Sequence, residues 1–117
     1  MAIEFKTSSY GTRNDVLFNP DHYVAFAQYI EKGNSLAKEV NGRKILKGGT
    51  IYPANDGTAV GVVLQDYDVT DGDANVAIVV HGFIDSNKLP EKPKQSAMAK
   101  MPMIKFMPLK YTGESDG

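Results

Sequence analysis

Two near-continuous apolar runs dominate the middle of the chain. They cover residues 59–64 and 76–84, and both are rich in valine. Such runs are typical of strands that are covered on both faces. The acidic segment 68–73 joins them, and its Asp-Gly pair predicts a hairpin turn. The pattern therefore predicts two buried strands, paired through an acidic hairpin, at the centre of the fold.

Shorter segments before this centre also favour strands. Residues 22–30 are ambiguous between strand and helix, but their β-branched and aromatic content favours a strand. Asn41-Gly42 is a strong hairpin signal, and residues 44–52 have the pattern of a strand that Gly48-Gly49 interrupts. Because turn residues separate these runs at short spacing, we expect a mainly β, sandwich-like or barrel-like architecture.

The C-terminal part predicts one short helix and a last strand. Residues 95–100 are long enough for one or two helical turns, which Pro102 stops. Residues 103–107 then have the pattern of a strand, which Pro108 ends.

The first residues have the character of an arm. Residues 3–7 alternate apolar and polar side chains as a short strand does, and residues 8–12 break that pattern. An isolated segment of this kind is either a frayed terminus or a strand that pairs with the sheet edge of a partner. We therefore expect a flexible N-terminal arm over residues 1–15 and a single β-rich domain over residues 16–117.

Composition narrows the class of protein. The chain has 117 residues, of which 42% are hydrophobic and 23% charged, as expected for one globular domain. It contains no cysteine, which excludes disulfides, thiolate metal sites and thiol catalysis. No run approaches the roughly 18 apolar residues of a membrane span, and no apolar signal-peptide region follows the N-terminus. We therefore expect a soluble domain with no membrane partner.

The charges are segregated along the chain. Residues 54–85 contain six aspartates and no Lys or Arg, whereas residues 86–110 contain six lysines and only Glu91 as an acid. Opposed potentials of this kind steer docking between copies or with a partner, although two solvated faces of one domain are the simpler alternative. The net charge is −1, and no nucleic-acid-binding motif is present, so we expect no nucleic-acid partner.

The search for reaction chemistry yields no active site. The cluster of residues 66–73 fails the calcium-loop register, so we expect a solvated hairpin tip and no metal. His81 and Asp85 share a strand face as an acid–base pair would, but no serine elbow or thiol accompanies them, and a structural role for His81 is favoured. The methionines after residue 97 indicate core filling or a partner contact. We therefore predict no catalytic, cofactor-binding or metal-binding residues and no enzyme activity.

The order of these segments resembles a known family. Gly49-Thr50-Ile51 leads to DGTAVGVV at 56–63, and the acidic hairpin leads to AIVVHGFI at 77–84 and a Leu89-Pro90 stop. This arrangement, over residues 44–106, resembles the head-decoration (capsid-stabilising) proteins of lambda-like tailed phages and their prophage relatives.

The resemblance implies both a fold and a function. It implies a small β-clip-like domain that forms a homotrimer on the outer surface of the expanded phage head and stabilises it, after synthesis in the bacterial cytoplasm. It further implies that the N-terminal arm binds the major capsid protein. The capsid-binding residues implied in this way are Ile3, Glu4, Phe5, Lys6, Thr7 and Tyr10.

Two other functions stay open. Trimeric β-clip folds also include nucleotide hydrolases, and residues 82–85 resemble their glycine–apolar–aspartate element, although no second acidic motif is in a matching place. A glycan-binding module of the virion is the other alternative, but the chain has no tryptophan on which a sugar would stack.

Overall fold

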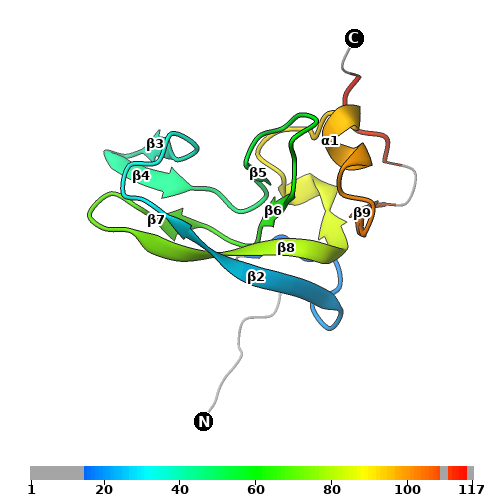
Figure 1. The fold of residues 1–117 in the computed structure, drawn as a ribbon, viewed down its shortest axis with the longest axis horizontal. Helices are drawn as coiled ribbons and strands as arrows, with labels where there is room; N and C mark the ends of the chain where they lie inside the picture. Colours follow the sequence, from blue (N-terminus) through cyan, green and yellow to red (C-terminus); the bar gives the residue numbers. More distant parts are fainter. Residues whose placement is uncertain (1–14, 109–110, 116–117) are drawn as a thin grey trace.

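A large sheet built around one long strand organises the molecule. The computed structural model describes residues 15–108 and 111–115, so the predicted strand over residues 3–7 lies outside the described residues. Strand β8 (Ala74–Asp85) has twelve residues, and β2 (Tyr23–Ile30) pairs antiparallel along one of its edges. As Figure 1 shows, these two strands run side by side along the base of the fold.

Short strands complete this sheet. β6 (Gly61–Val63) pairs antiparallel with β8, and β5 (Ile51–Tyr52) pairs with β6. β9 (Ile104–Met107) lies parallel to the last four residues of β8. The order β2-β8-β6-β5 makes β2 an edge strand among the described residues.

A smaller antiparallel sheet packs over one end of the large one. It contains β3 (Lys38–Val40), β4 (Arg43–Leu46) and β7 (Tyr67–Asp68), in that order. Asn41 and Gly42 join β3 to β4 with φ angles of 52° and 82°. These are the left-handed conformations that a two-residue hairpin requires, so the predicted turn is confirmed.

Two hydrophobic clusters account for the apolar runs in the sequence. Val76 and Ile78 of β8 pack with Leu46 of β4 in one cluster, whereas Val79 and Ile84 of β8 pack in the other. The second cluster includes side chains of helix α1 (Gln95–Ala99) and of β9. Since both faces of β8 are covered, nearly every position along it is apolar, as the sequence predicts.

The structure is mainly β with one short α-helix, which confirms the predicted fold class. A 3-10 turn, η1 (Ser86–Lys88), follows β8. The strand expected over residues 22–30 is β2, the helix expected over residues 95–100 is α1, and the last expected strand is β9. Each begins or ends within one residue of its prediction.

The connection between the central strands corrects one expectation. β6 and β8 are antiparallel neighbours, but β7 lies between them in the chain and pairs with β4, not with β8. Val69, which follows β7, is fully buried, and its amide donates to the Lys44 carbonyl at 2.9 Å. Burial of this side chain draws the segment into the small sheet, so a tight Asp-Gly hairpin does not form.

Candidate functional site

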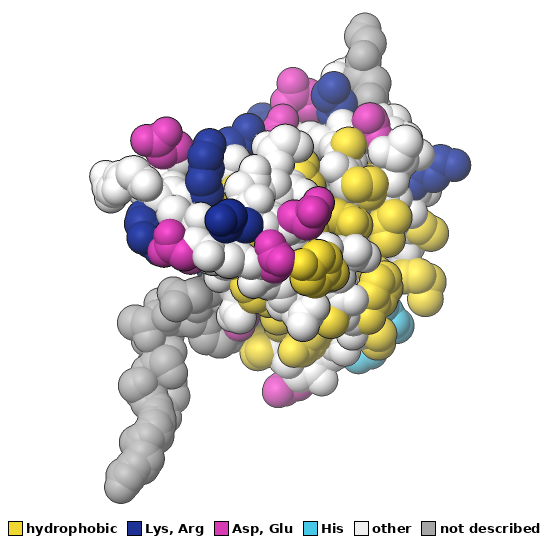
Figure 2. Space-filling model, turned by 60° about the vertical axis from the view of Figure 1, so that its left-hand side comes forward, with side chains coloured by type: hydrophobic (Ala, Val, Ile, Leu, Met, Phe, Trp, Pro, Cys, Tyr) yellow, Lys and Arg dark blue, Asp and Glu magenta, His cyan; other side chains and the backbone are white. Residues whose placement is uncertain are grey.

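The most unusual surface of the described residues is the edge strand β2. Exposure of the side chains is between 42% and 57% at four positions of this strand: Tyr23, Val24, Phe26 and Tyr29. The eight residues of β2, YVAFAQYI, carry no charge. Figure 2 shows hydrophobic side chains gathered in a band on this side of the molecule, with most charged side chains outside it. An apolar band on an edge strand is a typical protein-binding surface.

A groove runs beside these side chains. Its volume is about 560 Å³, and it is open to solvent. The register places Ala27 opposite Ala77, and the small side chains of Ala25, Ala27 and Ala77 line the groove. Leu64 and Tyr67 form the other side of the groove. Larger apolar side chains from another protein chain would fit between these walls.

A second hollow of about 270 Å³ continues the apolar surface past the start of β2. The rings of His22 and His81 meet there edge to face, with centroids 5.2 Å apart, and Phe83 lies against His22 at 5.8 Å. Met103, which is 58% exposed, lines the same hollow. Phe18, which is 53% exposed, is tied to Phe83 through a backbone hydrogen bond of 2.8 Å. Phe18 and Met103 thus extend the exposed apolar side chains of β2. Together, the six exposed side chains are called the β2 surface: Phe18, Tyr23, Val24, Phe26, Tyr29 and Met103.

His81 and Asp85, which the sequence analysis considered as an acid–base pair, have different neighbours in the structure. The ring of His81 packs against His22, whereas the carboxylate of Asp85 accepts a hydrogen bond from the Asn87 amide at 3.0 Å and caps η1. The sequence did not indicate the His22–His81 contact, because it depends on the register of β2 against β8, which places Val24 opposite His81.

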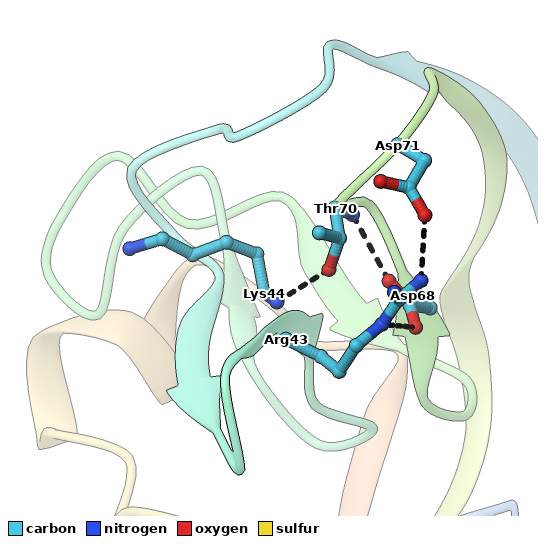
Figure 3. A network of polar contacts seen from close by, with 5 residues as sticks. All are labelled: Arg43, Lys44, Asp68, Thr70 and Asp71. Carbon is cyan, nitrogen blue, oxygen red and sulfur yellow. Dashed lines mark hydrogen bonds and ion pairs between the residues drawn. The ribbon is translucent and has the colours of Figure 1, made fainter.

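The acidic segment holds the small sheet together. Arg43 lies between two carboxylates, with Nε 2.9 Å from Asp68 and Nη2 2.9 Å from Asp71 (Figure 3). Asp68 also accepts the Thr70 amide at 3.0 Å, and the Thr70 hydroxyl accepts the Lys44 amide at 2.6 Å. The prediction of a solvated hairpin tip is therefore wrong in part: the side chains are exposed, but they tie β7 to β4.

Hydrogen bonds also determine the ionisation of this segment. Those from Thr70 to Asp68, followed by those from Arg43, lower the pKa of Asp68 from 3.8 to about 2. The Tyr29 hydroxyl and the Lys32 amide both donate to Asp73, and these bonds lower the pKa of Asp73. The bond to Asp73 raises the pKa of Tyr29 in turn, and it anchors the far end of β2.

Asp68→Asn is expected to reduce the acid sensitivity of the fold. The pKa of Asp68 is lower in the folded chain, about 2, than its ordinary value of 3.8. The ionised carboxylate thus stabilises the fold above pH 3.8, and this stabilisation is lost as the pH falls towards 2. Urea unfolding at several pH values in this window should show a shallower decline for Asp68→Asn than for the wild type. Asp21→Asn, which removes an exposed charge before β2, should keep the wild-type slope; equal slopes for all three would contradict the prediction.

The other residues that the sequence singled out fall into two groups. The capsid-binding residues Ile3, Glu4, Phe5, Lys6, Thr7 and Tyr10 lie outside the described residues. The methionines after residue 97 differ in burial: Met101 is buried in the core, whereas Met103 is exposed on the β2 surface. In the described part of the chain, no three His, Cys, Asp or Glu residues are grouped so that they could hold a metal ion. No helix in that part is long and apolar enough to span a membrane.

Comparisons with protein-family models, with characterised proteins and with solved structures find no match to this chain.

Proposed function

We propose that this chain is a structural protein that decorates the outer surface of a phage capsid as a homotrimer and stabilises the expanded head. The observation that carries the proposal is the uncharged, half-exposed edge strand β2. A domain of this size that leaves an apolar strand edge in solvent is suited to bind other protein chains. The resemblance of residues 44–106 to head-decoration proteins supplies the identity of the assembly.

The shape of the proposed assembly follows from symmetry. A capsid is a symmetric shell, so a protein that reinforces it acts best as a small closed oligomer at a symmetry axis. Many repeated weak contacts then stabilise the shell through multivalency. In this proposal the arm contacts the major capsid protein, through Ile3, Glu4, Phe5, Lys6, Thr7 and Tyr10.

Co-sedimentation with capsids tests this function. The probe is the purified full-length chain, mixed with empty expanded capsids assembled from the major capsid protein encoded in the same phage or prophage genome. We expect saturable binding to expanded shells, and shells that withstand higher temperature when decorated. Unexpanded shells of the same protein serve as the control and should bind less. Failure to bind expanded shells, or the lack of any major capsid protein in that genome, would contradict the proposal.

The alternative functions predict different results. A nucleotide hydrolase would release pyrophosphate or phosphate from nucleoside triphosphates with magnesium, and a glycan-binding module would bind host polysaccharide. Asp85, the acidic residue of the element that favoured a hydrolase, caps η1 in the structure. If the chain hydrolyses nucleoside triphosphates and Asp85→Asn abolishes this activity, a nucleotide hydrolase would replace the decoration protein as the proposed function.

A further inference from the structure

We infer that the β2 surface is where copies of this chain contact one another, so that a second copy covers it in the assembled protein. This inference rests on the proposed function, because it assigns one surface of that protein to self-association. The arm would then remain available for the capsid. Three features of the surface support the assignment.

The exposed apolar area is a large part of what a stable interface between two copies buries. Complete burial of an aromatic side chain removes about 150–250 Å² from solvent, so a half-exposed Phe or Tyr still exposes about 100 Å². Six side chains of the β2 surface are between 42% and 58% exposed. They therefore present on the order of 500 Å² of apolar area before the groove walls are counted, more than half of the roughly 800 Å² that each partner buries in a standard interface. Successive side chains of β2 point to opposite faces of the sheet, so a copy that pairs along the edge of β2 would contact both faces.

The charge distribution fits a permanent contact between copies. No charged residue lies within the eight residues of β2, and the strand has no proline. Edge strands exposed in solvent are commonly protected by charges or prolines, and this strand has neither. Interfaces between permanently associated subunits are more apolar than transient ones, which carry charged and polar groups. The β2 surface has the composition of the permanent class.

The strand is also held ready for pairing. β8 fixes one edge of β2 through eight register pairs, and Asp73 anchors its far end through Tyr29 and the Lys32 amide. Backbone groups on the free edge are therefore already in strand geometry, so a second chain that pairs with them loses little ordering entropy. The groove of about 560 Å³ beside this strand would receive side chains of that second copy.

Substitution of Phe26 tests the inference. The full-length Phe26→Glu variant places a charge in the middle of the β2 surface, and Gly57→Glu adds the same charge in an open loop where a new Cβ meets nothing within 4 Å. We expect Phe26→Glu to weaken self-association at least tenfold in sedimentation equilibrium, whereas Gly57→Glu associates as the wild type does. Self-association that is unchanged in Phe26→Glu, or a wild type that stays monomeric up to high concentration, would overturn the inference.

A cysteine probe tests the same surface in case Phe26→Glu does not fold. The chain has no native cysteine, so a single engineered thiol reports on its own site. Ala27→Cys introduces a small side chain on β2, and Gly57→Cys is the matched control. Alkylation of Cys at position 27 should slow at least fivefold as the protein concentration passes through the association range, whereas the control should keep its rate. Equal rates at all concentrations for Ala27→Cys would overturn the inference.

The two proposals fail separately. Chains that bind expanded capsids but associate without the β2 surface would leave the proposed function and remove this inference. Chains that associate through the β2 surface but never bind capsids would leave this inference and remove the proposed function. Protection of Cys at position 27 only when capsids are added would assign the β2 surface to the capsid protein, and would overturn the inference in favour of a foreign partner.

Discussion

Gly61→Ala is expected to lower the free energy of unfolding by about 2–3 kcal/mol, because overpacking of a core that has no room costs this much. A Cβ at Gly61 would lie 2.4 Å from the Val79 carbonyl oxygen and 2.7 Å from Cγ2 of Ile78. Both contacts are with β8, so relief of the clash requires β6 to move away from the central strand. The backbone hydrogen bonds around Val62 and Val63 would be strained as a result.

Gly57→Ala is the matched control for this substitution. It lies in the loop before β6, and a Cβ there would meet nothing within 4 Å. We expect its free energy of unfolding to remain within about 0.5 kcal/mol of the wild type, as for most surface substitutions. Urea unfolding at one protein concentration measures both variants, so that mass action on an oligomer does not distort the comparison. Equal midpoints for the two variants would show that β6 and β8 are not packed as described.

Removal of residues 1–14 is expected to weaken capsid binding at least tenfold while the domain still folds. The reason lies in where the core begins. Val16 and Leu17 are 3% exposed, and the Val16 amide donates to the Leu64 carbonyl at 3.0 Å. The Asp15 carboxylate accepts the Leu17 amide at 3.1 Å, so the truncation retains Asp15. Self-association through the β2 surface should also survive.

Substitutions within the arm keep its length and separate its two faces. Ile3 and Phe5 alternate with Glu4 and Lys6. Burial of an apolar side chain of this size contributes about 1.5–3 kcal/mol, so Ile3→Asp with Phe5→Asp should reduce capsid binding at least tenfold. Glu4→Gln is the control and should bind as the wild type does. Truncated chains that decorate capsids as well as the full chain would reduce the arm to a frayed end, and truncated chains that fail to fold would place Ile3 and Phe5 in the core.

Local sequence patterns predicted the individual elements well. The Asn41-Gly42 turn, the apolar strand over residues 76–84 and the helix before Pro102 each depend on neighbours in the chain, and each is present. The ambiguity over residues 22–30 also has a physical cause. An edge strand with exposed aromatic side chains lacks the strict alternation that marks a half-buried strand, so β2 could be recognised only by its β-branched and aromatic content.

The candidate site was less accessible to sequence reasoning. Tyr23, Val24 and Phe26 have the composition of a core strand, and no local pattern shows that they are half exposed. Their exposure is consistent with the sheet order, which gives β2 a single neighbouring strand, β8, among the described residues.

The sequence by itself determined a mainly β fold, the Asn41-Gly42 turn and the central place of residues 76–84, because turn chemistry and apolar periodicity act over a few residues. Only the tertiary structure decided which strands became neighbours. Burial of Val69 and the Arg43 bonds to Asp68 and Asp71 join β7 to β4, although these residues lie about 25 positions apart in the chain. Long-range pairing of this kind depends on which apolar surfaces can be covered together, and it is this pairing that leaves the edge of β2 open.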